Sequence, residues 1–276
     1  MNKVILALSI MFVFTSSAFA QQGGLNLKSR AALIFDAQQG RAIYSKNTDT
    51  IMPIASITKL MTAMVVLDAQ LPLTEEITID SADIDVLKNT RSRLRVGASL
   101  TRQQLLRLAL MSSENRAAAA LGRAYPGGIE AFVAAMNDKA FELGMGNSYF
   151  VDSTGLSSTN VSTARDLVKM VEAAYGYDLI RKFSTTSAHA VELADDGRSM
   201  QFINSNNLVR SGNWQINVSK TGFLSEAGRC LVMQANITGK PVIIVLLDSN
   251  GKDTRSGDAN RIKKWMETSL ARKRSS

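Results

Sequence analysis

Hydrophobic positions along the chain follow two different periods, and the two periods occupy different regions. Apolar or alternating runs predict strands near both ends, at 31–35, 41–45, 198–204, 214–220, 228–237 and 241–248. Helical spacing fills the middle, at 56–69, after a capping box at 101–104, and at 114–123, 129–143 and 163–175, and it returns at 261–271. The simplest arrangement is an α/β fold in which both chain ends build one sheet, terminal helices cover it, and a helical lobe is inserted between.

The first twenty residues differ from the rest of the chain. Lys3 precedes an apolar run from Val4 to Phe14, and Ala18 to Ala20 supply an A-x-A site. This pattern is typical of a cleaved secretory signal peptide, and the run is too short to span a bilayer comfortably. We therefore expect a leader at 1–20, an exported mature domain at 21–276, and no stable membrane anchor, because no second long apolar stretch follows.

Composition excludes several classes of chemistry. The formal net charge of +8 could favour an anionic envelope surface, and export makes nucleic acid an unexpected partner. Cys230 is the single cysteine, so no intramolecular disulfide can form, and its apolar neighbours predict a buried strand position. His189 is the single histidine, and no G-x-S-x-G elbow is present, which disfavours a histidine-dependent triad. We expect no metal and no cofactor.

The first candidate for chemistry is Ser56 with Lys59. Lys59 is the only charged residue between Asp49 and Asp68, and its neighbours are apolar, so the sequence predicts a lysine in a buried helix. Burial lowers the pKa of a lysine and can make it a base. Ser56, three residues earlier, shares the helix face and is expected at the helix N-terminus, where backbone N–H groups can stabilise negative charge. The alternative is a Ser56 that only caps the helix and a Lys59 that extends outward.

Two further short motifs follow in the order that a serine–lysine enzyme requires. Ser113 and Asn115 form an S-x-N motif at a predicted helix junction. Lys220, Thr221 and Gly222 form a K-T-G motif at the end of a predicted strand, where glycine allows close approach to the strand edge. Each motif is weak alone, but S-x-x-K, S-x-N and K-T-G together are typical of penicillin-binding proteins and class A β-lactamases.

With these motifs the chain resembles the low-molecular-mass penicillin-binding proteins, the serine D-alanyl-D-alanine peptidases, over nearly the whole mature chain. Segments 53–63, 110–118, 152–156 and 162–167 carry the resemblance, and the first two look most like the D-alanyl-D-alanine endopeptidase branch. The resemblance implies the antiparallel-sheet fold shared by β-lactamases and DD-peptidases. It also implies a periplasmic enzyme that acts on peptidoglycan stem peptides and is acylated by β-lactam antibiotics.

The resemblance implies a role for each matching residue in bond cleavage. Ser56 would attack the carbonyl of a D-alanyl bond, Lys59 would accept its proton, and Ser113 would relay a proton to the leaving amine. The N–H groups of Ser56 and Phe223 would form the oxyanion hole. Phe223 is assigned only by its position after Gly222.

The resemblance also implies how substrate is held. Asn115 would hold the substrate amide and help position Lys59. Lys220 would supply positive potential, and Thr221 would bind the substrate carboxylate, with Gly222 beside them.

Three other functions compete with the endopeptidase. A D-alanyl-D-alanine carboxypeptidase typically carries Ser-Gly-Asn as its second motif and an added C-terminal domain, whereas this chain has Ser113-Glu114-Asn115 and ends soon after Trp265. A class A β-lactamase needs a Glu-x-x-Leu-Asn segment, which the sequence lacks. A catalytically silent wall-binding protein would not need all three motifs intact.

Overall fold

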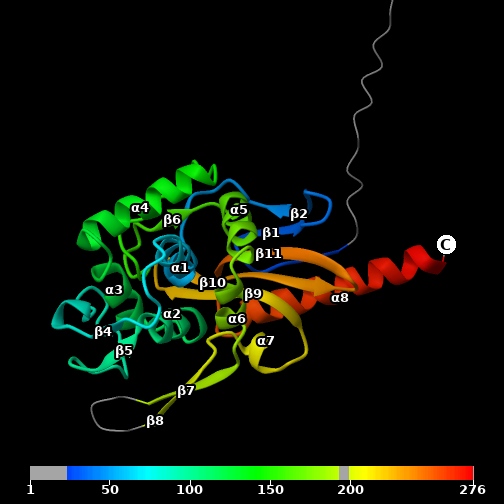
Figure 1. Ribbon diagram of the computed structural model, residues 1–276. Helices are drawn as coiled ribbons and strands as arrows, with labels where there is room; N and C mark the ends of the chain where they lie inside the picture. Colours follow the sequence, from blue (N-terminus) through cyan, green and yellow to red (C-terminus); the bar gives the residue numbers. More distant parts are fainter. Residues whose placement is uncertain (1–23, 193–198, 276) are drawn as a thin grey trace, which may run out of the picture.

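Strands from the two ends of the chain pair into one antiparallel sheet (Figure 1). The computed structural model describes residues 24–192 and 199–275. The sheet has the order β2-β1-β11-β10-β9 and is built from β1 (Ala31–Asp36), β2 (Arg41–Lys46), β9 (Gln215–Leu224), β10 (Gly228–Ile237) and β11 (Lys240–Ser249). Because β11 lies between β1 and β10, both chain ends form the sheet, as the sequence predicts.

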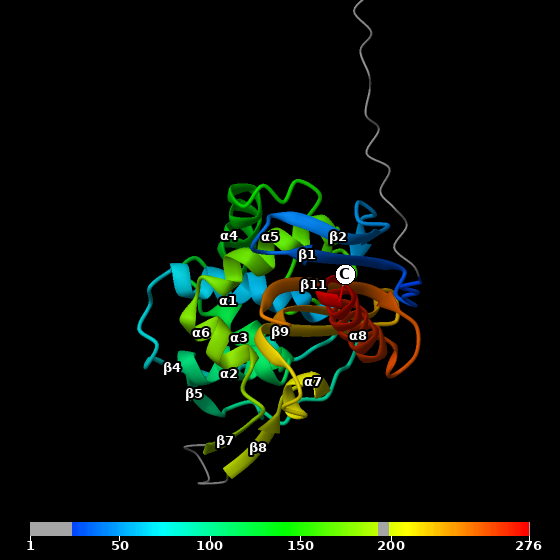
Figure 2. The ribbon, with the colours of Figure 1, turned by 90° about the vertical axis from the view of Figure 1, so that its right-hand side faces the viewer.

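Alternation along the central strands separates two apolar layers. On β11, Val245 and Leu247 join a cluster under α5 (Ala164–Tyr175), whereas Ile244 and Leu246 join a cluster under α8 (Thr254–Ser275). Successive strand side chains point to opposite faces, so a run of apolar residues buries both faces of the sheet. Figure 2 shows α8 crossing one face, with α5 on the other side of β1 and β11.

The helical lobe is inserted between β2 and β9. It contains η1 (Ala55–Thr58), α1 (Lys59–Asp68), α2 (Arg102–Met111), α3 (Asn115–Arg123), α4 (Gly128–Glu142) and α6 (Asp178–Ser184). Thr101 accepts a hydrogen bond from the Gln104 N–H and so forms the predicted capping box of α2. Thr163 caps α5 by accepting a hydrogen bond from the Asp166 N–H.

Short two-stranded pairings complete the fold. They are β3 (Met52–Pro53) with β6 (Val161–Ser162), β4 (Glu76–Thr78) with β5 (Ser99–Thr101), and β7 (Ala188–Glu192) with β8 (Ser199–Ile203), together with η2 (Ser81–Asp83) and α7 (Asn207–Arg210). The strand predicted at 198–204 is present, but it belongs to one of these pairings and not to the main sheet. Two predicted boundaries were wrong. The last helix begins at Thr254 rather than 261, and β9 continues through Leu224, so the K-T-G motif lies inside a strand.

Three further sequence predictions concern the leader, membrane-spanning helices and the single cysteine. The expected leader at 1–20 lies outside the described residues, as does Arg198 at the start of a predicted strand. Across residues 24–192 and 199–275, no helix is long and apolar enough to cross a membrane. Cys230 is fully buried in β10, as predicted, and burial raises the pKa of its thiol to about 11.

Candidate active site

Ser56 lies in a strained turn that is held from two sides. It belongs to the short 3₁₀ helix η1, not to the first turn of an α-helix as the sequence suggested, and α1 begins only at Lys59. Ala55, just before it, has a φ of 48°, a left-handed conformation that non-glycine residues rarely adopt. A Cβ on Gly155 would lie 2.1 Å from the Ala55 carbonyl oxygen, and one on Gly222 would lie 3.1 Å from the Ser56 nitrogen. The two glycines therefore let flanking segments close on the turn.

Lys59 is fully buried and points at Ser56. Its Nζ lies 3.0 Å from Ser56 Oγ, 2.7 Å from Asn115 Oδ1 and 2.6 Å from the Thr154 carbonyl oxygen. The amide and carbonyl oxygens can only accept hydrogen bonds. When the amine is neutral, its two N–H bonds satisfy these acceptors, so its lone pair faces the Ser56 hydroxyl. The outward-pointing alternative for Lys59 is excluded by its burial.

The protonation of Lys59 is set by opposing effects. Burial lowers the pKa of this amine to about 8, and the nearby carboxylates of Asp152, Glu114 and Asp85 oppose that shift. A pKa near 8 leaves an appreciable neutral fraction close to neutral pH, which an exposed lysine does not have. Lys59 therefore meets the electrostatic requirement for a base.

The second motif lies at the junction of α2 and α3, as predicted. Ser113 has a φ of 62°, and Asn115 is the first residue of α3. Glu114 between them caps α3 by accepting from the Arg116 N–H. This tight turn aims Ser113 at Lys220 and Asn115 at Lys59, so one junction serves both amines.

The third motif forms the opposite wall, on the edge strand β9. The buried Lys220 donates to Ser113 Oγ at 2.9 Å and to the Thr221 carbonyl at 2.9 Å. Burial, followed by repulsion from Lys59 and Arg255, lowers the Lys220 pKa well below its usual value. Thr221 Oγ1 donates to Ser205 Oγ at 2.7 Å. The structure therefore brings all three motifs together around Ser56.

Arg255 adds a positive charge that the sequence analysis missed. It extends from the start of α8 and donates to the carbonyl oxygens of Gly222 at 2.8 Å and Cys230 at 3.2 Å. Burial, then the nearby Arg229, lowers its pKa from the usual arginine value. No spacing pattern marks this residue, because it precedes the apolar helical repeat. The guanidinium places a cation behind the K-T-G strand, where an anionic ligand group would be favoured.

Phe223 lies next to Gly222, but its side chain turns outward. Phe223 is 56% exposed, and its ring centroid lies 4.5 Å from the Arg229 guanidinium carbon. Its backbone follows Gly222, the glycine that approaches the Ser56 nitrogen. The predicted oxyanion role would therefore belong to the Phe223 backbone and not to its ring.

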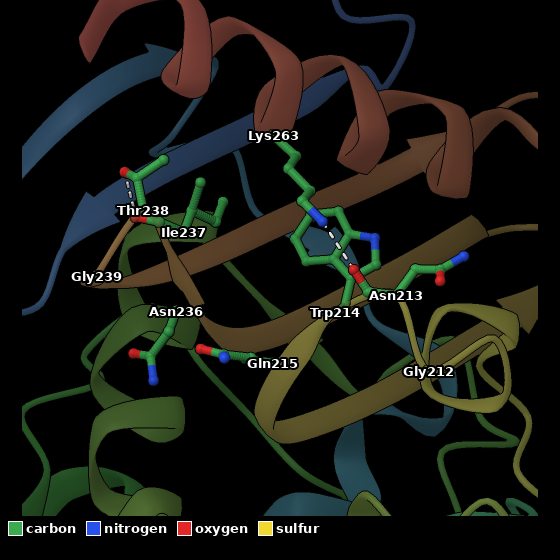
Figure 3. Close-up of a pocket in the computed structure, with 9 residues that line it drawn as sticks. All are labelled: Gly212, Asn213, Trp214, Gln215, Asn236, Ile237, Thr238, Gly239 and Lys263. Atoms are coloured by element: carbon green, nitrogen blue, oxygen red, sulfur yellow. Dashed lines mark hydrogen bonds between the residues drawn. The ribbon is translucent and has the colours of Figure 1, made fainter. Parts of the chain in front are cut away.

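Other polar clusters lie outside this site. His189 contacts Arg107 with both ring nitrogens, at 3.1 and 2.8 Å, and belongs to the β7–β8 hairpin. A hollow of about 450 Å³ lies between the start of β9, the β10–β11 turn and α8. Figure 3 shows Lys263 lying over the Trp214 ring there and donating to the Asn213 carbonyl, at 2.7 Å. None of the residues predicted for catalysis lines this hollow.

The fold and the three facing motifs define the class that unites penicillin-binding serine peptidases with serine β-lactamases. Within that class, residues 16–251 match the D-alanyl-D-alanine carboxypeptidase family. The chain is 46% identical to a D-alanyl-D-alanine endopeptidase of Pseudomonas aeruginosa, over 97% of this chain and 90% of that protein. It is also 46% identical to one of Escherichia coli, over 95% and 87%. The chain belongs to this family of serine peptidases, as the sequence predicts.

Solved structures confirm the predicted fold. A DD-transpeptidase from Streptomyces is 32% identical and superposes with a TM-score of 0.81, covering 87% of this chain and 97% of that one. A penicillin-binding protein of Listeria monocytogenes, solved with ampicillin bound, is 30% identical with a TM-score of 0.75, covering 88% and 98%. The antiparallel sheet with its inserted lobe is thus the DD-peptidase fold.

Proposed function

We propose that Ser56 is the nucleophile and Lys59 its general base. The observation that carries the proposal is the set of three contacts of the buried Lys59 amine, because two pure acceptors leave its lone pair for the Ser56 hydroxyl. Ser56 Oγ bonds to the D-alanyl carbonyl carbon as its proton passes to Lys59. The oxygen that becomes negative is held by the N–H groups of Ser56 and Phe223.

The remaining steps involve the amines of both Lys59 and Lys220. Collapse of the tetrahedral intermediate breaks the carbon–nitrogen bond. Ser113 passes its proton to the departing amine and is reprotonated with the proton that Lys59 took from Ser56, so Lys59 becomes neutral again. The Lys220 contact at 2.9 Å supports this role, since it holds the Ser113 hydroxyl within the site. Water then attacks the acyl-enzyme and gives a proton to the neutral Lys59. Lys59 returns this proton to the Ser56 oxygen as the acyl bond breaks, which releases the product carboxyl group and free Ser56.

We assign carboxylate recognition to the K-T-G strand. Thr221 offers a hydroxyl at the strand edge, and Lys220 and Arg255 supply positive potential around it. Asn115 has a second amide N–H available for a substrate carbonyl when its first is held within the protein. These groups fit a peptide that ends in, or carries, a carboxylate near the scissile bond.

The substrate that we propose is the D-alanyl crosslink between peptidoglycan stem peptides. Support comes from the 46% identity to two proteins named as D-alanyl-D-alanine endopeptidases over nearly their whole length, and from Glu114 in the second motif. Removal of a terminal D-alanine is the second candidate, favoured by more distant relatives named as carboxypeptidases. Penicillins would acylate Ser56 as they do in the family at large. The leader-like residues 1–20 support export, which would place the enzyme with its substrate in the periplasm.

The deciding experiment compares two muropeptides side by side. Purified protein is incubated with crosslinked dimers and with pentapeptide monomers, and the products are separated by chromatography. We expect loss of dimers; loss of terminal D-alanine alone would instead establish a carboxypeptidase. Ser56→Ala should abolish both the hydrolysis and covalent labelling by fluorescent penicillin. The variant should still be folded, which a cooperative thermal unfolding transition would show. Undiminished labelling of that variant would reject Ser56 as the nucleophile.

A further inference from the structure

The Asn115 side chain is held at both ends of its amide. Oδ1 accepts from Lys59 Nζ at 2.7 Å, and Nδ2 donates to Thr90 Oγ1 at 2.9 Å. Thr90 lies in the segment between η2 and β5, and it precedes Asn115 by 25 residues in the sequence. An amide that is reversed would direct N–H donors at Lys59, so its orientation matters to the base.

Thr90 can only accept from Asn115, because its own proton is used elsewhere. Its hydroxyl donates to Asp85 Oδ2 at 2.7 Å, and its backbone N–H donates to the same oxygen at 2.9 Å. A carboxylate accepts only, so the direction of each bond is fixed from Asp85 outward. Thr90 donates to Asp85 and accepts from Asn115; Asn115 in turn accepts from Lys59.

The segment that carries Thr90 is itself tied down. The other Asp85 oxygen accepts from the N–H groups of Leu87 and Lys88, both at 2.9 Å. Partial burial of Asp85 raises its pKa, but these hydrogen bonds outweigh burial and hold the pKa below its usual value, so the group stays an acceptor at neutral pH. Lys88 Nζ pairs with Glu226 in the β9–β10 turn, which joins the segment to the opposite wall of the site.

We propose that Thr90, oriented by Asp85, is a positioning residue that fixes the direction of the Asn115 amide and thereby keeps the Lys59 lone pair on Ser56. The inference rests on the proposed base role of Lys59. Among the described residues Thr90 has no hydrogen bond to Ser56 or Lys59, so it acts through Asn115. Its hydroxyl is needed, whereas its methyl group is not.

A set of three variants tests this role. Thr90→Val keeps the shape and removes the hydroxyl, Thr90→Ser keeps the hydroxyl, and Thr74→Val makes the same change on an exposed threonine outside the site. The rate of acylation by fluorescent penicillin is measured against pH. We expect Thr90→Val to be about fivefold to tenfold slower, the size of one lost neutral hydrogen bond, with the other two variants near wild type.

The pH profile separates positioning from loose folding. The charged groups facing Lys59 are the carboxylates of Asp85, Glu114 and Asp152 and the amine of Lys220. Thr90→Val leaves these in place but frees the Asn115 amide that stabilises the Lys59 ammonium, so the acid limb should move to lower pH. Thr90→Ser should restore both the wild-type acylation rate and the wild-type position of the acid limb in the pH profile.

Two results would overturn the inference. One is a Thr90→Val protein with wild-type rate and pH limb, which would mean that water replaces the hydroxyl. The other is a slower variant with an unmoved limb and a lower melting temperature, which would mean a structural role only. Ser56→Ala is assayed in parallel: if it remains labelled, the proposed function fails, whereas an unlabelled Ser56→Ala with an unaffected Thr90→Val rejects the Thr90 role alone.

Discussion

Lys59 and Lys220 are two buried amines that face each other across one reaction centre, and each is hydrogen-bonded to a serine hydroxyl. Lys59 Nζ lies 3.0 Å from Ser56 Oγ, and Lys220 Nζ lies 2.9 Å from Ser113 Oγ. Burial lowers the pKa of both amines, and charge on Lys59 lowers that of Lys220 further. The pair is coupled, so neutralising one amine makes it easier for the other to keep its proton.

The rate of acylation should rise with pH and level off above about pH 8 to 9. Below a pKa of about 8 Lys59 is protonated and cannot accept the Ser56 proton; above it the neutral amine predominates. The measurement is the initial rate of penicillin labelling across the neutral and alkaline range at constant ionic strength. A rate that does not change over that range, with chemistry limiting, would argue against a lysine base.

Replacing Lys59 by arginine should remove activity while keeping a positive charge. A guanidinium is not deprotonated in proteins, so it cannot serve as a base. We expect acylation to fall by about 10²–10⁴-fold, the usual contribution of a general base. Circular dichroism and thermal unfolding report whether the variant folds. Retention of more than a tenth of the rate in the folded variant would contradict the assignment, given that usual contribution.

Arg255→Gln should weaken recognition of carboxylate-bearing ligands. The change removes a cation that holds the Gly222 and Cys230 carbonyl oxygens behind the K-T-G strand. Charge-assisted contacts are worth about 1.5–3 kcal/mol, which predicts a loss of about tenfold to 100-fold in acylation efficiency. Penicillin and its carboxyl ester are compared on both proteins. The preference for the free acid should shrink in the variant; an unchanged preference would place Arg255 outside anion recognition.

Gly155→Ala should disturb the turn that holds Ser56. The new Cβ would lie 2.1 Å from the Ala55 carbonyl oxygen, on a residue with a φ of +78°. Overpacking and left-handed strain together predict a loss of about 2 kcal/mol or more in the free energy of unfolding. Gly146→Ala is the matched control, because its added Cβ meets nothing within 4 Å. Equal stability and labelling of the two variants would show that the close approach is not required.

The sequence predicted site residues that are close together in the chain better than contacts between distant segments. The serine and lysine of the first motif are one helical turn apart, and the buried, apolar surroundings of Lys59 were readable from its neighbours. What escaped prediction depends on contacts between distant segments. The Thr154 carbonyl reaches Lys59 across 95 positions, and Arg255 reaches Gly222 across 33. Neither residue type nor spacing marks such contacts.

The boundaries that were wrong have tertiary causes as well. Ser56 lies in a 3₁₀ turn, and Gly155 and Gly222 pack closely against the backbone before it. Helix propensity, which is a local property, does not report such contacts between distant segments. The helix at the C-terminal end begins at Thr254, ahead of its apolar repeat, and this extra part carries Arg255 into the site. The central strands, buried on both faces, were predicted well because their composition alone specifies them.

The position of β11 between β1 and β10 sets the order in which this protein can become reactive. The strand that joins the first part of the sheet to the wall carrying Lys220 is among the last segments of the chain to be synthesised. A nascent chain that contains Ser56 and Lys59 but not yet β11 cannot complete the sheet that carries Lys220. Pairings between segments that are far apart in the sequence form late in folding. We therefore expect the proposed Ser56–Lys59 pair to become reactive only after the last strands complete the sheet.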